Sequence, residues 1–137
     1  MGIQGQNEQE PELENLDLPD RHFQVWGYTI GHRWLVLRSV LKRSAGEHPG
    51  ERRRIDVLFV NVHSIKLPIQ LAGLTVHVAD GVLAERVLAD SGPAPIYASQ
   101  KVFIVEGRDY SGYVVASGFA MTKDEGDYNL PSKFWPP

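Results

Sequence analysis

Apolar and polar positions alternate over several short stretches of this chain, and the alternation predicts a mainly β structure. In the segments 55–59 and 74–78 every second residue is apolar, which is the period of a half-buried strand. Gly, Ser and Pro residues separate many of these stretches and predict turns between them. The strands predicted in this way span residues 22–30, 33–41, 53–60, 62–67, 74–78, 99–106 and 110–122.

One stretch has helical periodicity instead. Valines and leucines between positions 82 and 88 form an apolar stripe on a helix predicted over about 80–91. Asp80 suits the N-cap, and Gly92 followed by Pro93 ends the helix. A parallel sheet would need more crossover helices than this. We therefore predict a mainly β (α+β) fold of about seven strands with one helix, arranged as an antiparallel curved sheet, an open barrel or a two-layer sandwich.

Local features add detail to this prediction. Gly31 and His32 connect two strands and predict a β-hairpin. In the first strand the large residues change from odd to even positions beside Gly27, which predicts a β-bulge. The last predicted strand, 110–122, has small residues on one face, and we expect the helix to pack there.

Charge divides the chain into parts. Residues 1–20 contain six acidic residues and no Lys or Arg, which predicts a flexible acidic arm. Its leucines, at positions 13, 16 and 18, are available to dock on the domain or on a partner. Residues 21–129 form a single β-rich domain. Residues 130–137 form an aromatic and proline-rich tail, which either folds back on the sheet or contacts a partner.

Composition limits the location and the chemistry. The sequence contains no Cys, which excludes disulfides and thiolate chemistry and fits a reducing compartment. The first residues lack the basic start and apolar run of a signal peptide. No apolar stretch approaches the ~20 residues of a membrane-spanning helix. We therefore expect a cytoplasmic protein without a membrane partner.

The sequence contains no recognisable catalytic motif. The five histidines, at positions 22, 32, 48, 63 and 77, do not have metal-binding spacing. His63 and His77 are candidates to face each other on neighbouring strands, although two exposed strand histidines are the more common outcome. Serine elbows and phosphate-binding glycine loops are absent. We predict no catalytic residue, no metal site and no cofactor, and we expect Asp56 to form a cross-strand ion pair with Arg38.

A basic cluster is the one candidate binding site that the sequence offers. Lys42, Arg43, Arg52, Arg53 and Arg54 flank a loop and are candidates to bind an anion or an acidic partner, including the acidic arm. A solvated loop is the simpler interpretation of the same residues. Aromatic residues do not alternate with these cations, so base stacking is not supported. With its mild net charge, the domain is not expected to bind nucleic acid.

Three segments carry a resemblance to known proteins. Residues 26–39, 55–62 and 65–68 resemble a group of uncharacterised small bacterial β-rich proteins. The Phe-x-x-Val-x-x-Ile spacing that begins at Phe59 is similar to that of small immunity proteins from bacterial toxin systems. The resemblance implies a non-enzymatic cytoplasmic protein and assigns no functional residue.

The sequence therefore favours a non-catalytic protein that binds a protein partner, with an immunity-like role among the options. A homodimer is compatible with it. The alternative is a small-ligand-binding or enzymatic β-barrel whose site forms only in the fold. A pocket with convergent polar groups would favour this alternative, whereas a flat apolar patch beside an acidic rim would favour the binding protein.

Overall fold

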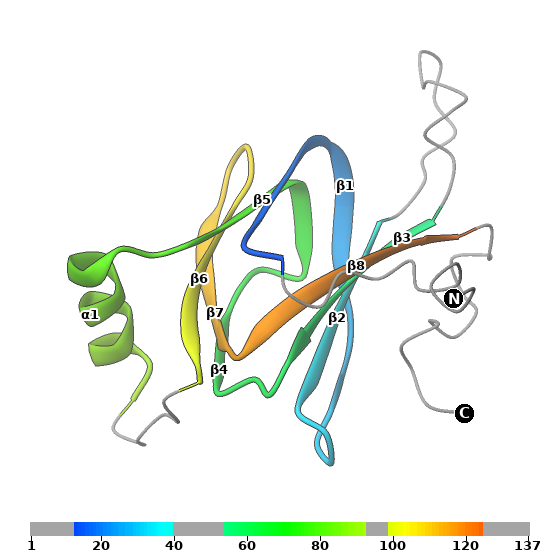
Figure 1. The fold of residues 1–137 in the computed structure, drawn as a ribbon. Coiled ribbons are helices and arrows are strands. Elements are labelled where there is room, and N and C mark those ends of the chain that lie inside the picture. Colours follow the sequence, from blue (N-terminus) through cyan, green and yellow to red (C-terminus); the bar gives the residue numbers. More distant parts are fainter. Residues whose placement is uncertain (1–12, 40–53, 93–98, 125–137) are drawn as a thin grey trace, which may run out of the picture.

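A computed structural model describes residues 13–39, 54–92 and 99–124. The elements are β1 (Asn15–Thr29), β2 (Trp34–Ser39), β3 (Arg54–Val60), β4 (Ser64–Lys66), β5 (Gln70–Val78), α1 (Gly81–Asp90), β6 (Lys101–Glu106), β7 (Ser111–Ala116) and β8 (Gly118–Asp124). The described strands form one eight-stranded antiparallel sheet in the order β4-β7-β6-β5-β1-β2-β3-β8, with α1 beside it (Figure 1). The sheet is curved and is not closed into a barrel, so the predicted mainly β class with a curved sheet is confirmed.

β1 is the longest strand, at 15 residues, and it joins the two halves of the sheet. Its first part pairs with β5, from Asn15 opposite His77 onward, and its last part pairs with β2. The predicted flexible arm over 1–20 is therefore wrong for the range 15–20, which is strand. Ladder hydrogen bonds and the packing of Leu16 and Leu18 against the core order this acidic stretch. Residues 1–12 lie outside the described residues.

The β1–β2 hairpin confirms two predictions from the sequence. The strands pair from Phe23 opposite Ser39 to Thr29 opposite Trp34, and a turn over 30–33 connects them. The register shifts between Val25 and Gly27, which is the expected bulge. The bulge rotates the strand, so that Trp26 packs on the outer face of the sheet with Val36.

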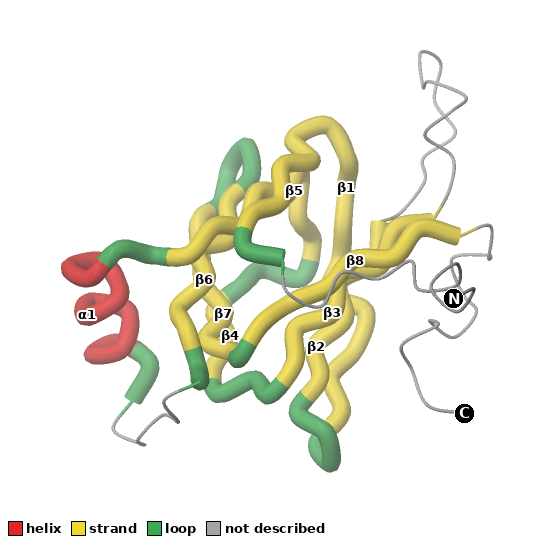
Figure 2. The backbone as a smooth tube through the Cα atoms, in the orientation of Figure 1, coloured by secondary structure: helices red, strands yellow, loops and turns green. Residues whose placement is uncertain are grey.

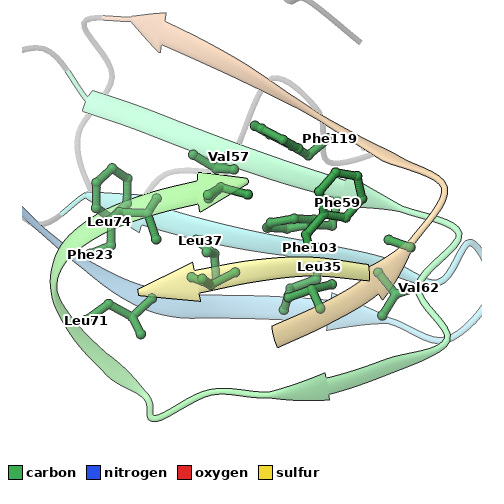
Figure 3. Packing of buried hydrophobic residues seen from close by; sticks show 14 of the residues in the cluster. Phe23, Leu35, Leu37, Val57, Phe59, Val62, Leu71, Leu74, Phe103 and Phe119 are labelled. Carbon is green, nitrogen blue, oxygen red and sulfur yellow. The ribbon is translucent and has the colours of Figure 1, made fainter. Parts of the chain in front are cut away.

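The core lies inside the curve of the sheet (Figure 3). Three phenylalanines from β3, β6 and β8 meet there: Phe59, Phe103 and Phe119. The ring centroid of Phe59 lies 5.9 Å from that of Phe103 and 5.3 Å from that of Phe119, and the centroids of Phe103 and Phe119 lie 5.4 Å apart. Aromatic pairs at these separations add to the stabilisation from apolar burial. Strands that are distant in sequence thus share one core, which holds the turns at both ends of the sheet in fixed positions.

The predicted strand over 110–122 is two strands, β7 and β8, because the chain bends at Ser117. β7 pairs with β6 and β4, whereas β8 pairs with β3. The expectation that α1 packs on the small-residue face is also wrong. The helix packs on the opposite face, with Tyr113 and Val115. β4 pairs with β7 within the sheet, and a Cβ on Gly112 would clash with the carbonyl oxygen of Lys66. Close backbone contact, and not helix packing, explains this glycine.

The helix α1 forms as predicted and covers the outer face of β6 and β7 (Figure 2). The Asp80 carboxylate accepts a hydrogen bond of 2.9 Å from the backbone N–H of Leu83, which completes the N-cap. Val87 is buried against a small second cluster that includes Tyr113 and Val115. Among the described elements, no helix has the length and apolarity that crossing a membrane requires.

Candidate functional site

The predicted basic cluster lies mostly outside the described residues. Positions 42, 43, 52 and 53 are in the range 40–53, which the structure does not describe. Arg54 begins β3, is buried, and donates from Nη2 to the Asp124 carboxylate at 3.0 Å. Arg54 and Asp124 are also opposite each other in the β3–β8 ladder. The Arg54 guanidinium therefore links two strands in this structure.

Asp56 forms the predicted cross-strand ion pair with Arg38. The Arg38 Nε and Nη2 atoms donate to the two Asp56 carboxylate oxygens at 2.8 and 3.0 Å, and both side chains have an exposed fraction of 0%. The Trp26 ring lies over the guanidinium, 4.4 Å from its carbon to the ring centroid. This bidentate, stacked geometry uses the carboxylate as a structural partner. It is not the arrangement of a solvent-accessible catalytic acid.

The candidate histidine pair does not form. His77 lies on β5, whereas His63 precedes β4, and β6 and β7 separate these strands in the sheet. The described residues contain no group of three or more His, Asp or Glu side chains that could hold a metal ion.

A small groove lies between α1 and the sheet, with a volume of about 220 Å³. Leu83 and Val87 form its apolar side, and Lys66, Glu106 and Ser111 line its polar side. Ligand pockets usually measure about 300–1,000 Å³, so this groove is small for an organic substrate.

The polar groups near the groove bond mostly to one another. The Tyr113 hydroxyl donates to the Asp90 carboxylate at 3.0 Å, and the Lys66 ammonium lies 3.4 Å from the same carboxylate. Burial, together with the neighbouring Asp90, raises the pKa of the Tyr113 phenol above its ordinary value. These contacts join the end of α1 to β4 and β7. They explain how the helix is held and do not indicate a reaction.

Among the described residues, the most exposed large apolar side chain lies at the tip of the β1–β2 hairpin, which projects below the rest of the sheet in Figure 1. Ile30 is 85% exposed, and Tyr28, near the end of β1, is 45% exposed. The rings of His32 and Trp34 lie 5.0 Å apart across the turn. The tip thus presents an isoleucine and aromatic residues to solvent within one short segment.

Backbone and hydroxyl groups hold this turn in place. Arg33 has a left-handed φ of 55°, and its carbonyl oxygen accepts a 3.0 Å hydrogen bond from the backbone N–H of Val62. The Thr29 hydroxyl accepts a 3.3 Å hydrogen bond from the backbone N–H of Trp34. A left-handed residue that is not glycine costs conformational energy, so these bonds have to fix the turn. The tip is therefore a defined shape.

A second layer of polar contacts supports the base of the turn. Asn61, also left-handed with φ of 52°, donates from its side chain to the Ser117 hydroxyl at 2.8 Å. The Gln100 side-chain amide donates to the Asn61 carbonyl at 2.9 Å, and the hydroxyls of Ser99 and Ser117 lie 3.2 Å apart. We call this surface the hairpin end. It consists of residues 30–33, 61–63, 99–101 and 117.

The hairpin end is positively charged. It contains Arg33 and Lys101 together with His32 and His63, and none of its residues is Asp or Glu. In the described part of the chain, neither Arg33 nor Lys101 forms an ion pair. An apolar tip beside cations without carboxylate partners is a surface that a binding partner can cover and neutralise.

The sequence located the hairpin turn but did not identify its tip as a surface. Tyr28 and Ile30 continue the apolar run of the strand directly into the Gly31-His32 turn. In a turn that only connects strands, polar residues are expected at those positions. These two large residues beside a turn were the sequence feature that could have indicated an exposed surface. Their exposure depends on what packs on them, which a strand pattern does not reveal.

The chain matches no known protein-family model, no curated protein and no solved structure. Its function therefore has to be argued from the geometry of the described residues.

Proposed function

We propose that this chain is a non-catalytic protein that binds a protein partner through the hairpin end. The observation that carries the proposal is Ile30, which is 85% exposed at the tip of a turn that hydrogen bonds hold in place. Contiguous apolar surface that stays in solvent is a mark of interaction sites. Tyr28 in the same short segment is 45% exposed, so the tip carries a second exposed large side chain.

The residue types at the tip support this proposal. Tyr, Trp and Arg are enriched among the residues that dominate binding energy in protein interfaces. Tyr28, Arg33 and Trp34 are of these types and lie near the exposed isoleucine in the sequence. Because Val62 fixes the turn through its backbone, little conformational entropy has to be lost when a partner binds. A braced turn of this composition favours a specific contact.

The surface differs from the flat, acid-rimmed patch that a binding function led us to expect, since it projects and carries cations. It still favours binding over the alternative of a ligand site or an enzyme. The groove beside α1 is smaller than an ordinary ligand pocket, and two of its polar lining residues, Tyr113 and Lys66, already contact the Asp90 carboxylate. The buried Asp56 is likewise occupied by Arg38.

An immunity-like role is one form of the proposed activity. In such a role the chain would cover a functional surface of a bacterial toxin inside the producing cell. The similarity of the spacing at Phe59, Val62 and Ile65 motivates this form. A projecting, rigid tip suits it because it can enter a concave surface.

Affinity purification from the native cell, followed by mass spectrometry, tests the proposal. The bait is the full chain in three forms: wild type, Ile30→Ser and Val82→Ser. Val82 lies on α1 and is 67% exposed, so its replacement removes a comparable apolar side chain from another surface. We expect one protein to be enriched with wild type and with Val82→Ser, and to be lost with Ile30→Ser.

Two results would contradict the proposal. One is equal enrichment with Ile30→Ser and wild type, which would move the partner away from the hairpin end. The other is the absence of any enriched protein together with a metabolite that reproducibly raises the melting temperature, which would favour the ligand-binding alternative. Circular dichroism of all three forms checks that each one is folded.

A further inference from the structure

We infer that the surface which receives the hairpin end is an apolar pocket rimmed by Asp or Glu residues on a different protein, with Ile30 inside the pocket and Arg33 at its rim. This inference rests on the proposed function and adds the chemistry of the partner. It follows from the shape of the tip and from the distribution of charge around it.

The shape of the tip predicts the pocket. Ile30 and Gly31 lie in the four-residue turn over 30–33, which Thr29 and Trp34 close as a strand pair, and both are exposed. A side chain in this position contacts a flat surface over little of its area, whereas a pocket encloses it. The hydrogen bond from the Val62 N–H to the Arg33 carbonyl oxygen ties the end of the turn to the segment after β3. The partner therefore has to supply the concave side of the contact.

The charge of the tip predicts the rim. From residue 21 to residue 39 the chain contains no Asp or Glu, so the whole hairpin lacks carboxylates beyond the first part of β1. The neighbouring segments of the hairpin end add Lys101 and no acid. The described hydrogen bonds between side chains at its base join Asn61, Ser99 and Ser117, which are uncharged. Complementarity then requires anionic groups on the partner.

A protein pocket accounts for these features better than an anionic membrane. Juxtamembrane binding through charge takes clusters of about 4–8 Lys or Arg residues. The hairpin end offers only Arg33, in the hairpin turn, and Lys101, at the start of β6. The left-handed φ of 55° at Arg33 directs the turn in one conformation, which suits a partner with fixed geometry.

Site-specific photo-crosslinking tests the inference. A benzophenone amino acid replaces residue 30 in the full chain, and in a matched control it replaces residue 82 on α1. After irradiation in the native cell, the cross-linked peptides are identified by mass spectrometry. We expect position 30, and not position 82, to link to a segment of another protein in which apolar residues lie beside Asp or Glu.

The captured partner then allows a charge test. Asn and Asp tolerate left-handed backbone, so Arg33→Asn removes the charge and Arg33→Asp reverses it with little strain. We expect Kd to rise at least tenfold for Arg33→Asp and less for Arg33→Asn, and the association rate of wild type to fall as salt is added. Replacement of the partner's rim carboxylate by Lys should restore binding to Arg33→Asp. Arg108→Asp, at an exposed residue between β6 and β7, should leave Kd unchanged.

The failures of the two ideas are distinguishable. A cross-link from position 30 to a basic or uncharged surface, or to a second copy of this chain, overturns the inference and leaves protein binding intact. An unchanged Kd for Arg33→Asp does the same. A cross-link to phospholipid, or none at position 30 while position 82 captures a protein, overturns both the inference and the proposed binding surface.

Discussion

The turns at the two ends of the sheet differ in how far they pack against the rest of the domain. At the end opposite the hairpin end, the turn between β6 and β7 folds back and packs on the sheet. The Tyr110 hydroxyl donates to the Gly73 carbonyl at 2.7 Å, and the backbone N–H of Arg108 donates to the Ala72 carbonyl at 2.9 Å. We call residues 107–110 the packed turn. At the hairpin end, Ile30 points away from the domain and is 85% exposed.

Charges follow the same division. The ion pairs Arg38–Asp56 and Arg54–Asp124 lie on the parts of β2, β3 and β8 that are farthest from the hairpin turn. At the hairpin end, Arg33 and Lys101 have no carboxylate partner among the described residues.

This difference separates stability from binding. One end satisfies its polar and apolar groups internally, so substitutions there should change the free energy of unfolding. Under the proposed function the hairpin end binds a partner, so substitutions there should change affinity and leave the free energy of unfolding almost unaltered.

Asp56→Ala should cause the largest change. It leaves the Arg38 guanidinium buried without its carboxylate, and the loss of one partner of a buried pair costs about 3–5 kcal/mol. Urea denaturation, monitored by circular dichroism, measures this loss in the free energy of unfolding. The double replacement Arg38→Met with Asp56→Leu is the matched control and should lose much less, because no charge is left unpaired. A double variant as unstable as the single one would show that packing, and not the ion pair, dominates.

A pair of glycines compares the two turns directly. A Cβ on Gly107 would lie 2.1 Å from the Tyr110 ring and 2.5 Å from the Ala72 carbonyl oxygen, whereas a Cβ on Gly31 meets nothing within 4 Å. Gly107→Ala should therefore reduce the free energy of unfolding by about 1–3 kcal/mol. Gly31→Ala should stay within about 0.5 kcal/mol of wild type. Equal effects in urea denaturation would contradict the comparison.

A pair of tyrosines isolates one hydrogen bond. Tyr110→Phe removes the donor to the Gly73 carbonyl and should cost about 1 kcal/mol. Tyr28→Phe, at the hairpin end, removes a hydroxyl from a side chain that is 45% exposed and should leave stability unchanged. Thermal unfolding of both variants measures the difference. A larger loss of stability for Tyr28→Phe than for Tyr110→Phe would show that the hairpin end contributes to the stability of the fold.

The same tyrosine predicts a dependence on alkaline pH. Burial, then the nearby charges of Asp109 and Glu106, raises the pKa of Tyr110 above its ordinary value of 10.0. The folded protein therefore keeps the phenol proton at pH values where the unfolded chain loses it. The contribution of the protonated Tyr110 phenol to the free energy of unfolding is therefore complete below about pH 10 and is lost as the pH rises further. The difference in stability between wild type and Tyr110→Phe should shrink above pH 10, and a constant difference would contradict the assignment.

Ile30→Ser should have the smallest effect on stability. Its side chain contacts mainly solvent, so the free energy of unfolding should change by less than about 0.5 kcal/mol. The same substitution should weaken partner binding about tenfold or more, since a buried apolar anchor carries a large share of the interface energy. Thermal unfolding and a titration with the captured partner measure the two quantities. A destabilised Ile30→Ser variant would mean that the tip supports the fold.

Much of the fold was predictable because it depends on local patterns. The hairpin, the bulge beside Gly27 and the helix with its Asp80 cap all follow from neighbouring residues. The ion pair between Arg38 and Asp56 was also predictable, because opposite charges on adjacent antiparallel strands meet when the register places them opposite.

The predictions that were wrong or incomplete have a common cause. The acidic stretch over 15–20 is strand because β5 supplies its hydrogen bonds, and β5 is distant in sequence. The predicted strand over 110–122 divides at Ser117 because its halves pair with different partners. The sequence offered clustered cations as the candidate binding site, and most of them lie outside the described residues. The exposed tip, which we now propose as the binding surface, was predicted only as a turn. Each case depended on a contact that local sequence does not encode.

The sequence by itself determined a single β-rich domain, its hairpin and helix, and the absence of cysteine chemistry, because strand period, turn residues and composition are local properties. The tertiary structure decided which turn packs and which one projects. Tyr110 bonds Gly73 because β5 and β6 are adjacent in the sheet, and the Arg33 carbonyl is held because the chain brings Val62 beside it. Exposure of Ile30 follows from these long-range contacts, since a side chain is exposed only where no other part of the fold covers it.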